Sequence, residues 1–223
     1  MPNSIPAAVL WDMDGTLIDS EHYWLAAERQ LASQTGSTWT DEDGQSLIGM
    51  SLYASSDILN KRFGLEHGVE RTIELLTESV QQNLRRQIPW RPGALELLRE
   101  IRERGIKTAL VTMSMHRMAQ VVAENTGFDA FDLVLGGDDV THGKPHPEPY
   151  LKAAEMLGDE IERCIAFEDS ISGLASAEAS GALAIGIPNL VNLPGKPDRI
   201  IWPTLQSVTV DDLARVLQEK RPQ

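Results

Sequence analysis

From residue 88 onward, short apolar runs alternate with amphipathic segments. The apolar runs have the length of buried strands and occupy residues 107–112, 131–135, 164–168 and 182–187, and a fifth lies near the start of the chain at 7–12. The segments with helical spacing fall between or after them, at 94–104, 117–125, 148–157, 171–180 and 211–219. Strands that alternate with helices in this way predict βαβ units and a parallel sheet.

Residues 18–87 break this alternation, because they contain helical segments but no convincing strand. We expect helices at 21–34, shortly after Thr40, at 52–63 and at 69–86. The last one carries a stripe of core-forming apolar residues at Val69, Ile73, Leu76, Val80 and Leu84. The pair Pro92-Gly93 marks the return to the sheet. We therefore predict an α/β fold, a Rossmann-like parallel sheet flanked by helices, formed by residues 1–17 and 88–223, with an all-helical module inserted at 18–87.

Charge and composition narrow the classes of partner and compartment. With 20 Lys and Arg against 33 Asp and Glu, the net charge of −13 argues against a nucleic-acid partner. Cys164 is the only cysteine, which excludes an intrachain disulfide and suits a reducing compartment. No apolar run is long enough for a bilayer, and the first Lys or Arg is Arg29, so no positively charged segment indicates a signal sequence. We therefore expect no membrane association and a cytoplasmic protein. A monomer is compatible with the sequence, which leaves the oligomeric state open.

Acidic residues follow the first predicted strand. Asp12 and Asp14 are two residues apart, so their side chains can converge on one side of the chain. Ligands of parallel sheets bind beyond the carboxyl ends of the strands, and this is such an end. An Asp-x-Asp-Gly sequence is equally typical of a plain polar turn, so the pair alone does not decide between a site and a turn.

The ends of other strands favour a site. Thr112 ends the second strand and is followed by Met113 at a turn into a helix, where free backbone N–H groups can hold an anion. Lys144 follows the third strand, and Glu168-Asp169 ends the fourth. Several hard oxygen ligands suit Mg²⁺, and a lysine with a threonine suits a phosphoryl group. Together these strand ends indicate a site for phosphoryl transfer.

These motifs resemble those of the haloacid dehalogenase-like hydrolase superfamily, in the subgroup with a helical cap between the first and second motifs. The resemblance covers nearly the whole chain. It includes Asp12-x-Asp14-Gly15-Thr16-Leu17-x-Asp19-Ser20, then Thr112, then Lys144 in Gly-Lys-Pro-x-Pro-Glu-Pro, and finally Glu168-Asp169-Ser170. It implies that the inserted helices at 18–87 form the cap.

The resemblance also implies a role for each motif residue. Asp12 would be the nucleophile that forms an aspartyl phosphate, and Asp14 the general acid and base. Mg²⁺ would bind Asp12, the backbone carbonyl of Asp14, Asp169, and Glu168 directly or through water. The phosphoryl oxygens would be held by Thr112, Met113 and Lys144. We therefore expect a Mg²⁺-dependent phosphatase acting on a small phosphorylated metabolite.

Three alternatives are weighed against this expectation. A sugar phosphomutase of the same subgroup would have a histidine and an arginine in the cap, and the aligned positions hold Trp24 and Leu52. A dehalogenase is disfavoured because those relatives lack the second carboxylate, which is Asp14 here. A phospho-accepting signalling domain would place its aspartate after the third strand, whereas Asp12 follows the first. The phosphatase is the preferred interpretation, and the mutase is the nearest rival.

Two histidines near Lys144 are a further candidate pair of metal ligands. His142 and His146 are four residues apart, but Pro145 and Pro147 exclude the helix that would align them. We therefore expect a solvated loop there instead of a zinc site.

Overall fold

The computed structural model describes residues 5–220, which form a six-stranded parallel sheet in the order β3-β2-β1-β4-β5-β6. The strands are β1 (Ala8–Trp11), β2 (Lys107–Val111), β3 (Leu133–Leu135), β4 (Cys164–Glu168), β5 (Leu183–Gly186) and β6 (Ile200–Ile201). Trp11, the last residue of β1, pairs with Leu110 on one side and Phe167 on the other. The residue that follows β1 therefore lies between the ends of β2 and β4.

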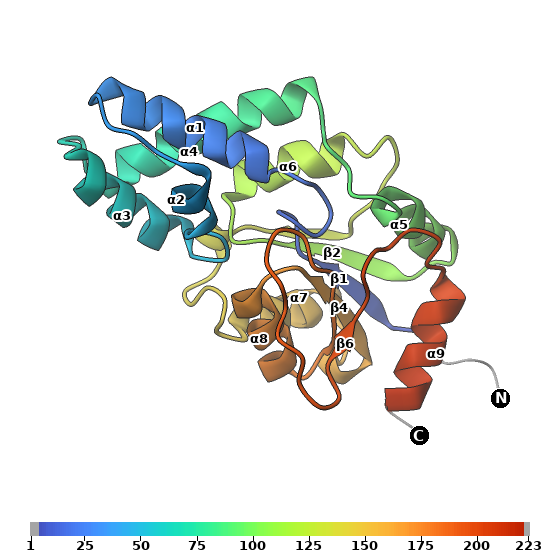
Figure 1. Cartoon of the computed structure of the whole chain (residues 1–223). Helices are drawn as coiled ribbons and strands as arrows, with labels where there is room; N and C mark the ends of the chain where they lie inside the picture. The colour runs from blue at the N-terminus through green and yellow to red at the C-terminus, as the bar shows by residue number, and fades with distance from the viewer. Residues whose placement is uncertain (1–4, 221–223) are drawn as a thin grey trace.

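Helices cover both faces of this sheet (Figure 1). One face packs against α5 (Ala94–Glu103), α6 (His116–Glu124) and α9 (Val210–Lys220), and the other against α7 (Glu148–Leu157) and α8 (Ile171–Ser180). The side chains of β1 alternate between the two cores, Val9 and Trp11 on one side and Ala8 and Leu10 on the other. All four are fully buried, as expected for a central strand of a parallel sheet.

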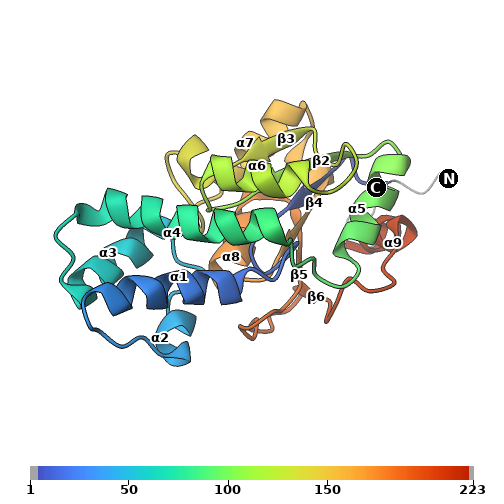
Figure 2. The same cartoon turned by 90° about the horizontal axis from the view of Figure 1, so that it is seen from above.

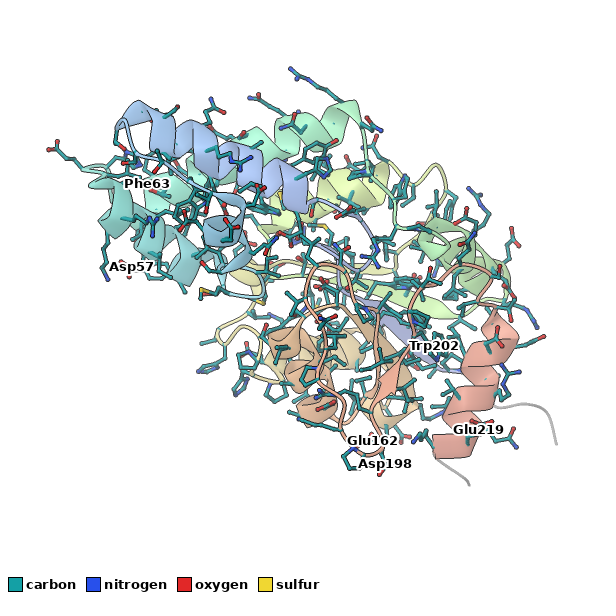
Figure 3. The ribbon with its side chains drawn as sticks, viewed as in Figure 1. Asp57, Phe63, Glu162, Asp198, Trp202 and Glu219 are labelled. Carbon is teal, nitrogen blue, oxygen red and sulfur yellow. The ribbon has the colours of Figure 1, made fainter. Side chains whose placement is uncertain are left out.

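Residues between β1 and α5 form a separate group of helices, which lies to one side of the sheet in Figure 2. These are α1 (Glu21–Gln34), α2 (Asp41–Gln45), α3 (Leu52–Phe63) and α4 (Gly68–Arg86). Three residues of the predicted stripe on α4, Leu76, Val80 and Leu84, are buried. Phe63, labelled in Figure 3, meets the ring of Trp39 edge-on at 5.3 Å between ring centroids.

Two short connections join these helices to the sheet, and they pair with each other. Ile18 forms an antiparallel bridge with Trp90. The N–H of Asp19 donates to the carbonyl of Pro89 at 2.8 Å, and the N–H of Arg91 donates to the carbonyl of Leu17 at 3.0 Å. The helical insertion therefore enters and leaves the α/β part of the chain at one place.

The predicted α/β fold with a parallel sheet is confirmed, and the differences lie at element ends and at β6. Strand β3 begins at Leu133, two residues later than predicted. Strand β6 is not predicted by the sequence pattern, because its two residues follow a long polar loop and show no alternation. Trp202, labelled in Figure 3, anchors this edge, with its ring centroid 6.2 Å from that of Phe167. Among residues 5–220, no helix combines the length and apolar character that crossing a bilayer requires.

Candidate active site

Asp12 and Lys144 form a buried ion pair at the centre of the sheet edge. Asp12 directly follows β1, and its Oδ1 accepts a hydrogen bond from Lys144 Nζ at 2.7 Å. The same ammonium donates to the carbonyl of Val111 at 2.9 Å and lies 2.7 Å from Glu168 Oε1. Burial acts to lower the pKa of Lys144, but Asp12 and then Glu168 outweigh it, so the pKa lies above its ordinary value. Lys144 is therefore a fixed positive charge at this edge.

Asp12, Glu168 and Asp169 offer carboxylate oxygens that all lie within 4.8 Å of one another. Burial, followed by repulsion from Glu168, raises the pKa of Asp12. Burial, followed by repulsion from Asp12, raises the pKa of Asp169. In addition, Asp12 Oδ2 is buried and has no hydrogen-bond partner among residues 5–220. A hard divalent cation fits this group of residues, since it prefers carboxylate oxygens and would offset their repulsion.

Two glycines allow Glu168 and Asp169 to come close to the backbone. A Cβ atom added to Gly15, whose φ is +85°, would lie 2.0 Å from Asp169 Oδ2. A Cβ added to Gly173 would lie 1.9 Å from Glu168 Oε2. The hydroxyl of Tyr150 also donates a hydrogen bond to Glu168 Oε1, which fixes the position of this carboxylate. Any side chain at either glycine would displace an acid from its present position.

Asp14 lies apart from this acidic group and is held by other donors. Its Oδ1 accepts from Ser20 Oγ at 2.5 Å and from Trp24 Nε1 at 3.0 Å. Its Oδ2 accepts from Ser114 Oγ at 2.7 Å and from Thr112 Oγ1 at 3.4 Å. Because Trp24 belongs to α1 and Ser114 follows β2, this carboxylate connects the helical insertion to the sheet.

The predicted phosphate-binding turn follows β2. The N–H of Ser114 donates to Thr112 Oγ1 at 3.0 Å, which holds the turn in shape. The sulfur of Met113 accepts from the N–H of Lys144 at 3.4 Å, so its side chain packs against the loop that carries the lysine. The structure thus brings Thr112, Met113 and Lys144 together at the end of β2.

Above the acids, α1 and the loops of the insertion close a pocket. Glu21, Trp24 and Glu28 lie on one face of α1 and line it, as do Thr112 and Lys144 from the sheet. Apolar side chains supply much of the remaining wall, namely Leu47, Ile48, Met50 and Leu52. Of the described residues that line this pocket, Lys144 is the only lysine or arginine.

The two glutamates of this wall hold their protons more strongly than usual. Burial, followed by repulsion from Asp14, raises the pKa of Glu21 to about 8. Burial raises the pKa of Glu28 to about 7, although Trp39 Nε1 donates to its Oε2 at 2.7 Å. Near neutral pH the wall therefore carries less negative charge than two fully ionised glutamates would.

Six of the seven site residues expected from the sequence line this pocket, and the seventh, Glu168, is fully buried with its Oε1 2.7 Å from Lys144 Nζ. Several residues that contact them were not predicted. Ser20 lies at the N-cap of α1, but its hydroxyl donates to Asp14 and makes no capping hydrogen bond. The sequence indicates only that Trp24 occupies the position of the histidine of a mutase. The hydrogen bond from its indole to Asp14 is not visible in any local pattern. The spacing of Glu21, Trp24 and Glu28, three and four residues apart, was the available signal that they share a helix face.

A family model described as haloacid dehalogenase-like hydrolase matches residues 6–181. The chain is 30% identical over 175 residues to a phosphorylated carbohydrates phosphatase from Thermotoga maritima, covering 78% of this chain and 81% of the relative. It is 29% identical over 194 residues to hexitol phosphatase B from Escherichia coli K12, covering 84% and 85%.

Two solved structures resemble this chain over nearly its whole length. A CbbY variant from Rhodobacter sphaeroides, in complex with xylulose-(1,5)-bisphosphate, is 25% identical, with a TM-score of 0.80 and coverage of 94% of this chain and 99% of that one. A β-phosphoglucomutase from Clostridium difficile shares the fold at 24% identity and a TM-score of 0.81, covering 96% and 98%. The chain belongs to the haloacid dehalogenase-like hydrolase family, as its four motifs indicate, and it is an enzyme.

Proposed function

We propose that the protein is a Mg²⁺-dependent phosphatase that hydrolyses a small phosphorylated metabolite through an aspartyl phosphate on Asp12. The observation that carries this proposal is the separation of the two early aspartates. Asp12 lies among Lys144, Glu168 and Asp169, whereas Asp14 is held by hydroxyl and indole donors beside the pocket. Two carboxylates in such different surroundings suit a nucleophile and a separate proton carrier.

In the first step, a carboxylate oxygen of Asp12 attacks phosphorus and the bond from phosphorus to the ester oxygen breaks. Asp12 Oδ2 suits this role, because no described residue donates a hydrogen bond to it, whereas Oδ1 is held by Lys144. Asp14 gives its proton to the leaving oxygen. In the second step Asp14 takes a proton from water, which attacks phosphorus, and inorganic phosphate and the Asp12 carboxylate are released.

Asp12, Glu168 and Asp169 would hold the Mg²⁺, together with the backbone carbonyl of Asp14. When bound, the ion would neutralise the charge that otherwise keeps an anionic carboxylate from an anionic phosphate. The oxygen-only donor set supports Mg²⁺ over a softer metal. Lys144 and the turn at Thr112 and Met113 would hold the phosphoryl oxygens.

The lining of the pocket supports an uncharged, hydroxyl-rich leaving group. Glu21 and Glu28 can accept hydrogen bonds from hydroxyl groups or donate hydrogen bonds to them. Leu52 carries no positive charge that could bind a second phosphate. Lys144 is already engaged by Asp12 and Glu168. The names of the two curated relatives, which refer to phosphorylated carbohydrates and to hexitols, support the same class of substrate. These features favour a monophosphatase over a phosphomutase, which must accommodate a bisphosphate.

We further propose that residues 18–87 are a cap domain that opens on the paired connections at Ile18 and Trp90. Hydrogen bonds between residues 18–87 and the rest of the chain would then indicate the closed state. Ser172 Oγ donates to the carbonyl of Gly49 at 2.6 Å, and Gln81 Nε2 donates to the carbonyl of Arg117 at 2.9 Å. Closure would exclude water from the Asp12 site during phosphoryl transfer.

A phosphate-release screen tests this function. Wild-type protein with Mg²⁺ is assayed against hexitol, hexose, glycolate and nucleotide monophosphates, and against a hexose 1-phosphate with a bisphosphate primer. We expect inorganic phosphate from the polyol or sugar monophosphates and no accumulation of an isomerised sugar phosphate. Rapid conversion of the 1-phosphate to a 6-phosphate would show that the enzyme is a mutase. Release that is unchanged by EDTA and by Asp12→Asn would contradict the proposed site.

A further inference from the structure

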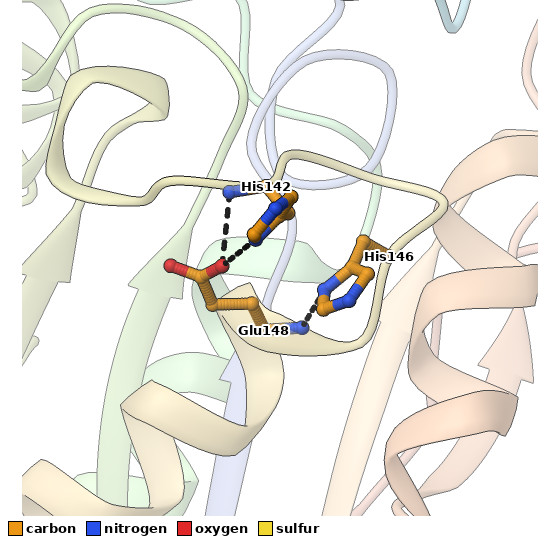
Figure 4. A group of neighbouring side chains, drawn as sticks. All are labelled: His142, His146 and Glu148. Carbon is orange, nitrogen blue, oxygen red and sulfur yellow. Dashed lines mark hydrogen bonds and ion pairs between the residues drawn. The ribbon is translucent and has the colours of Figure 1, made fainter.

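A second group of potential metal ligands lies on the outside of the loop that carries Lys144. His142 and His146 come from this loop, and Glu148 is the first residue of α7 (Figure 4). Each of the three offers a ligand atom, and these atoms lie within 4.8 Å of one another. The two imidazole rings face each other, with centroids 4.7 Å apart and planes inclined by 34°.

The expectation that the two histidines would not be aligned is therefore wrong. Pro145 and Pro147 do exclude a helix at this point, and the loop is solvated as predicted. However, the loop folds back on itself, with the N–H of His146 donating to the carbonyl of Gly143 at 3.0 Å. A turn of this kind brings the two rings together without helical spacing.

Hydrogen bonds hold this arrangement from several sides. The Glu148 carboxylate accepts from the N–H of Thr141 at 2.7 Å and from the N–H of His142 at 2.9 Å. Its Oε2 also lies 2.8 Å from His142 Nδ1 (Figure 4). The carbonyl of His146 accepts from Ser176 Oγ at 2.6 Å, which ties that end of the loop to α8. The framework is thus fixed, while both rings remain open to solvent.

From this geometry we propose that His142, His146 and Glu148 bind one divalent ion of the Zn²⁺, Ni²⁺ or Cu²⁺ type. Two imidazoles and a carboxylate form a donor set that such borderline ions prefer and that Mg²⁺ does not. The exposed position leaves water to complete the coordination shell. The ion would take the place of the proton between His142 and Glu148, and the ring of His146 would turn toward it.

This site would differ from the acidic group at Asp12 in both chemistry and position. The acidic group offers only oxygen ligands and is buried, whereas the second group offers two ring nitrogens at the surface. Lys144 lies two residues from each histidine and points inward to Asp12. An ion bound outside would therefore hold the loop that positions this lysine.

The test is metal binding by tag-free protein with Mg²⁺ in excess to occupy the acidic site. Isothermal titration with Zn²⁺ should show one equivalent bound by wild type. Affinity should fall by about tenfold or more in His142→Ala and in His146→Ala, because each removes a ligand. His22→Ala, which removes an exposed histidine of α1, is the matched control and should bind as wild type does.

Cu²⁺ provides a second measurement that identifies the ligands. Pulsed electron paramagnetic resonance of the wild-type complex should show couplings from two imidazole nitrogens, reduced to one in either loop variant. Circular dichroism checks that each variant is folded. Absence of Zn²⁺ uptake by wild type, equal uptake by all four proteins, or Cu²⁺ spectra without imidazole coupling would each overturn the proposal.

Discussion

Glu28 allows a quantitative prediction of how stability changes with pH. Its side chain is buried in the wall of the pocket, where Trp39 Nε1 donates to it. Burial raises its pKa from 4.5 to about 7. In the Glu28→Gln variant the amide oxygen can still accept from Trp39, but no charge can form at that position.

The magnitude follows from linkage between protonation and folding. Below pH 4.5 both the folded and the unfolded chain hold the Glu28 proton, so no penalty arises. As the pH rises from 4.5 to 7, the unfolded chain ionises first and stability is lost. Above pH 7 the loss levels off at about 3 kcal/mol, since each unit of pKa difference is worth about 1.4 kcal/mol.

Urea denaturation of both proteins between pH 4.5 and 8.5 measures this effect. We expect the stability of Glu28→Gln relative to wild type to increase by up to about 3 kcal/mol over that range. Any cost of burying the amide is constant with pH and leaves this increase unchanged. Glu103→Gln, at an exposed position of α5, corrects for the same replacement in solvent. A difference that stays flat or declines with pH would refute the reasoning.

Three further outcomes test the roles assigned to the site and the cap. Asp14→Asn should lower kcat by roughly 10²–10⁴-fold, measured by phosphate release, while calorimetry shows Mg²⁺ binding retained; a loss of Mg²⁺ binding would contradict its role in proton transfer. Trp24→Phe keeps an aromatic ring but removes the donor to Asp14 Oδ1. We expect kcat to fall by about tenfold, which corresponds to the loss of one hydrogen bond to a charged group. An unchanged kcat would exclude this contact from catalysis. With Mg²⁺ and beryllium fluoride, hydrogen exchange at the amides of Asp19 and Arg91 should slow, and equal rates with and without the ligands would argue against cap closure.

The α/β fold was predictable because each strand is a short apolar run between turn residues. Strand β6 was not, since its two residues pair with β5 only after the loop before them has folded back. That pairing depends on contacts such as those of Trp202 with Phe167, which are far apart in sequence. Local patterns carry no information about such an edge strand.

The candidate site was predictable to the extent that its residues follow strands. Asp12, Thr112 and Glu168 occupy ends of neighbouring parallel strands, so the topology alone brings them together. Tyr150 donates to Glu168 from the first turn of α7, and Trp24 donates to Asp14 from α1. Their positions depend on how whole helices pack, which the sequence pattern does not reveal.

The central claim is that Asp12 carries the phosphoryl group. The most direct measurement is to quench the wild-type enzyme during turnover of p-nitrophenyl phosphate with Mg²⁺, reduce it with borohydride and map the peptides by mass spectrometry. An aspartyl phosphate at Asp12 is reduced to homoserine at that position, so the account predicts homoserine at residue 12 that depends on substrate and Mg²⁺. Turnover without homoserine at residue 12, or with the modification at another residue, would contradict it.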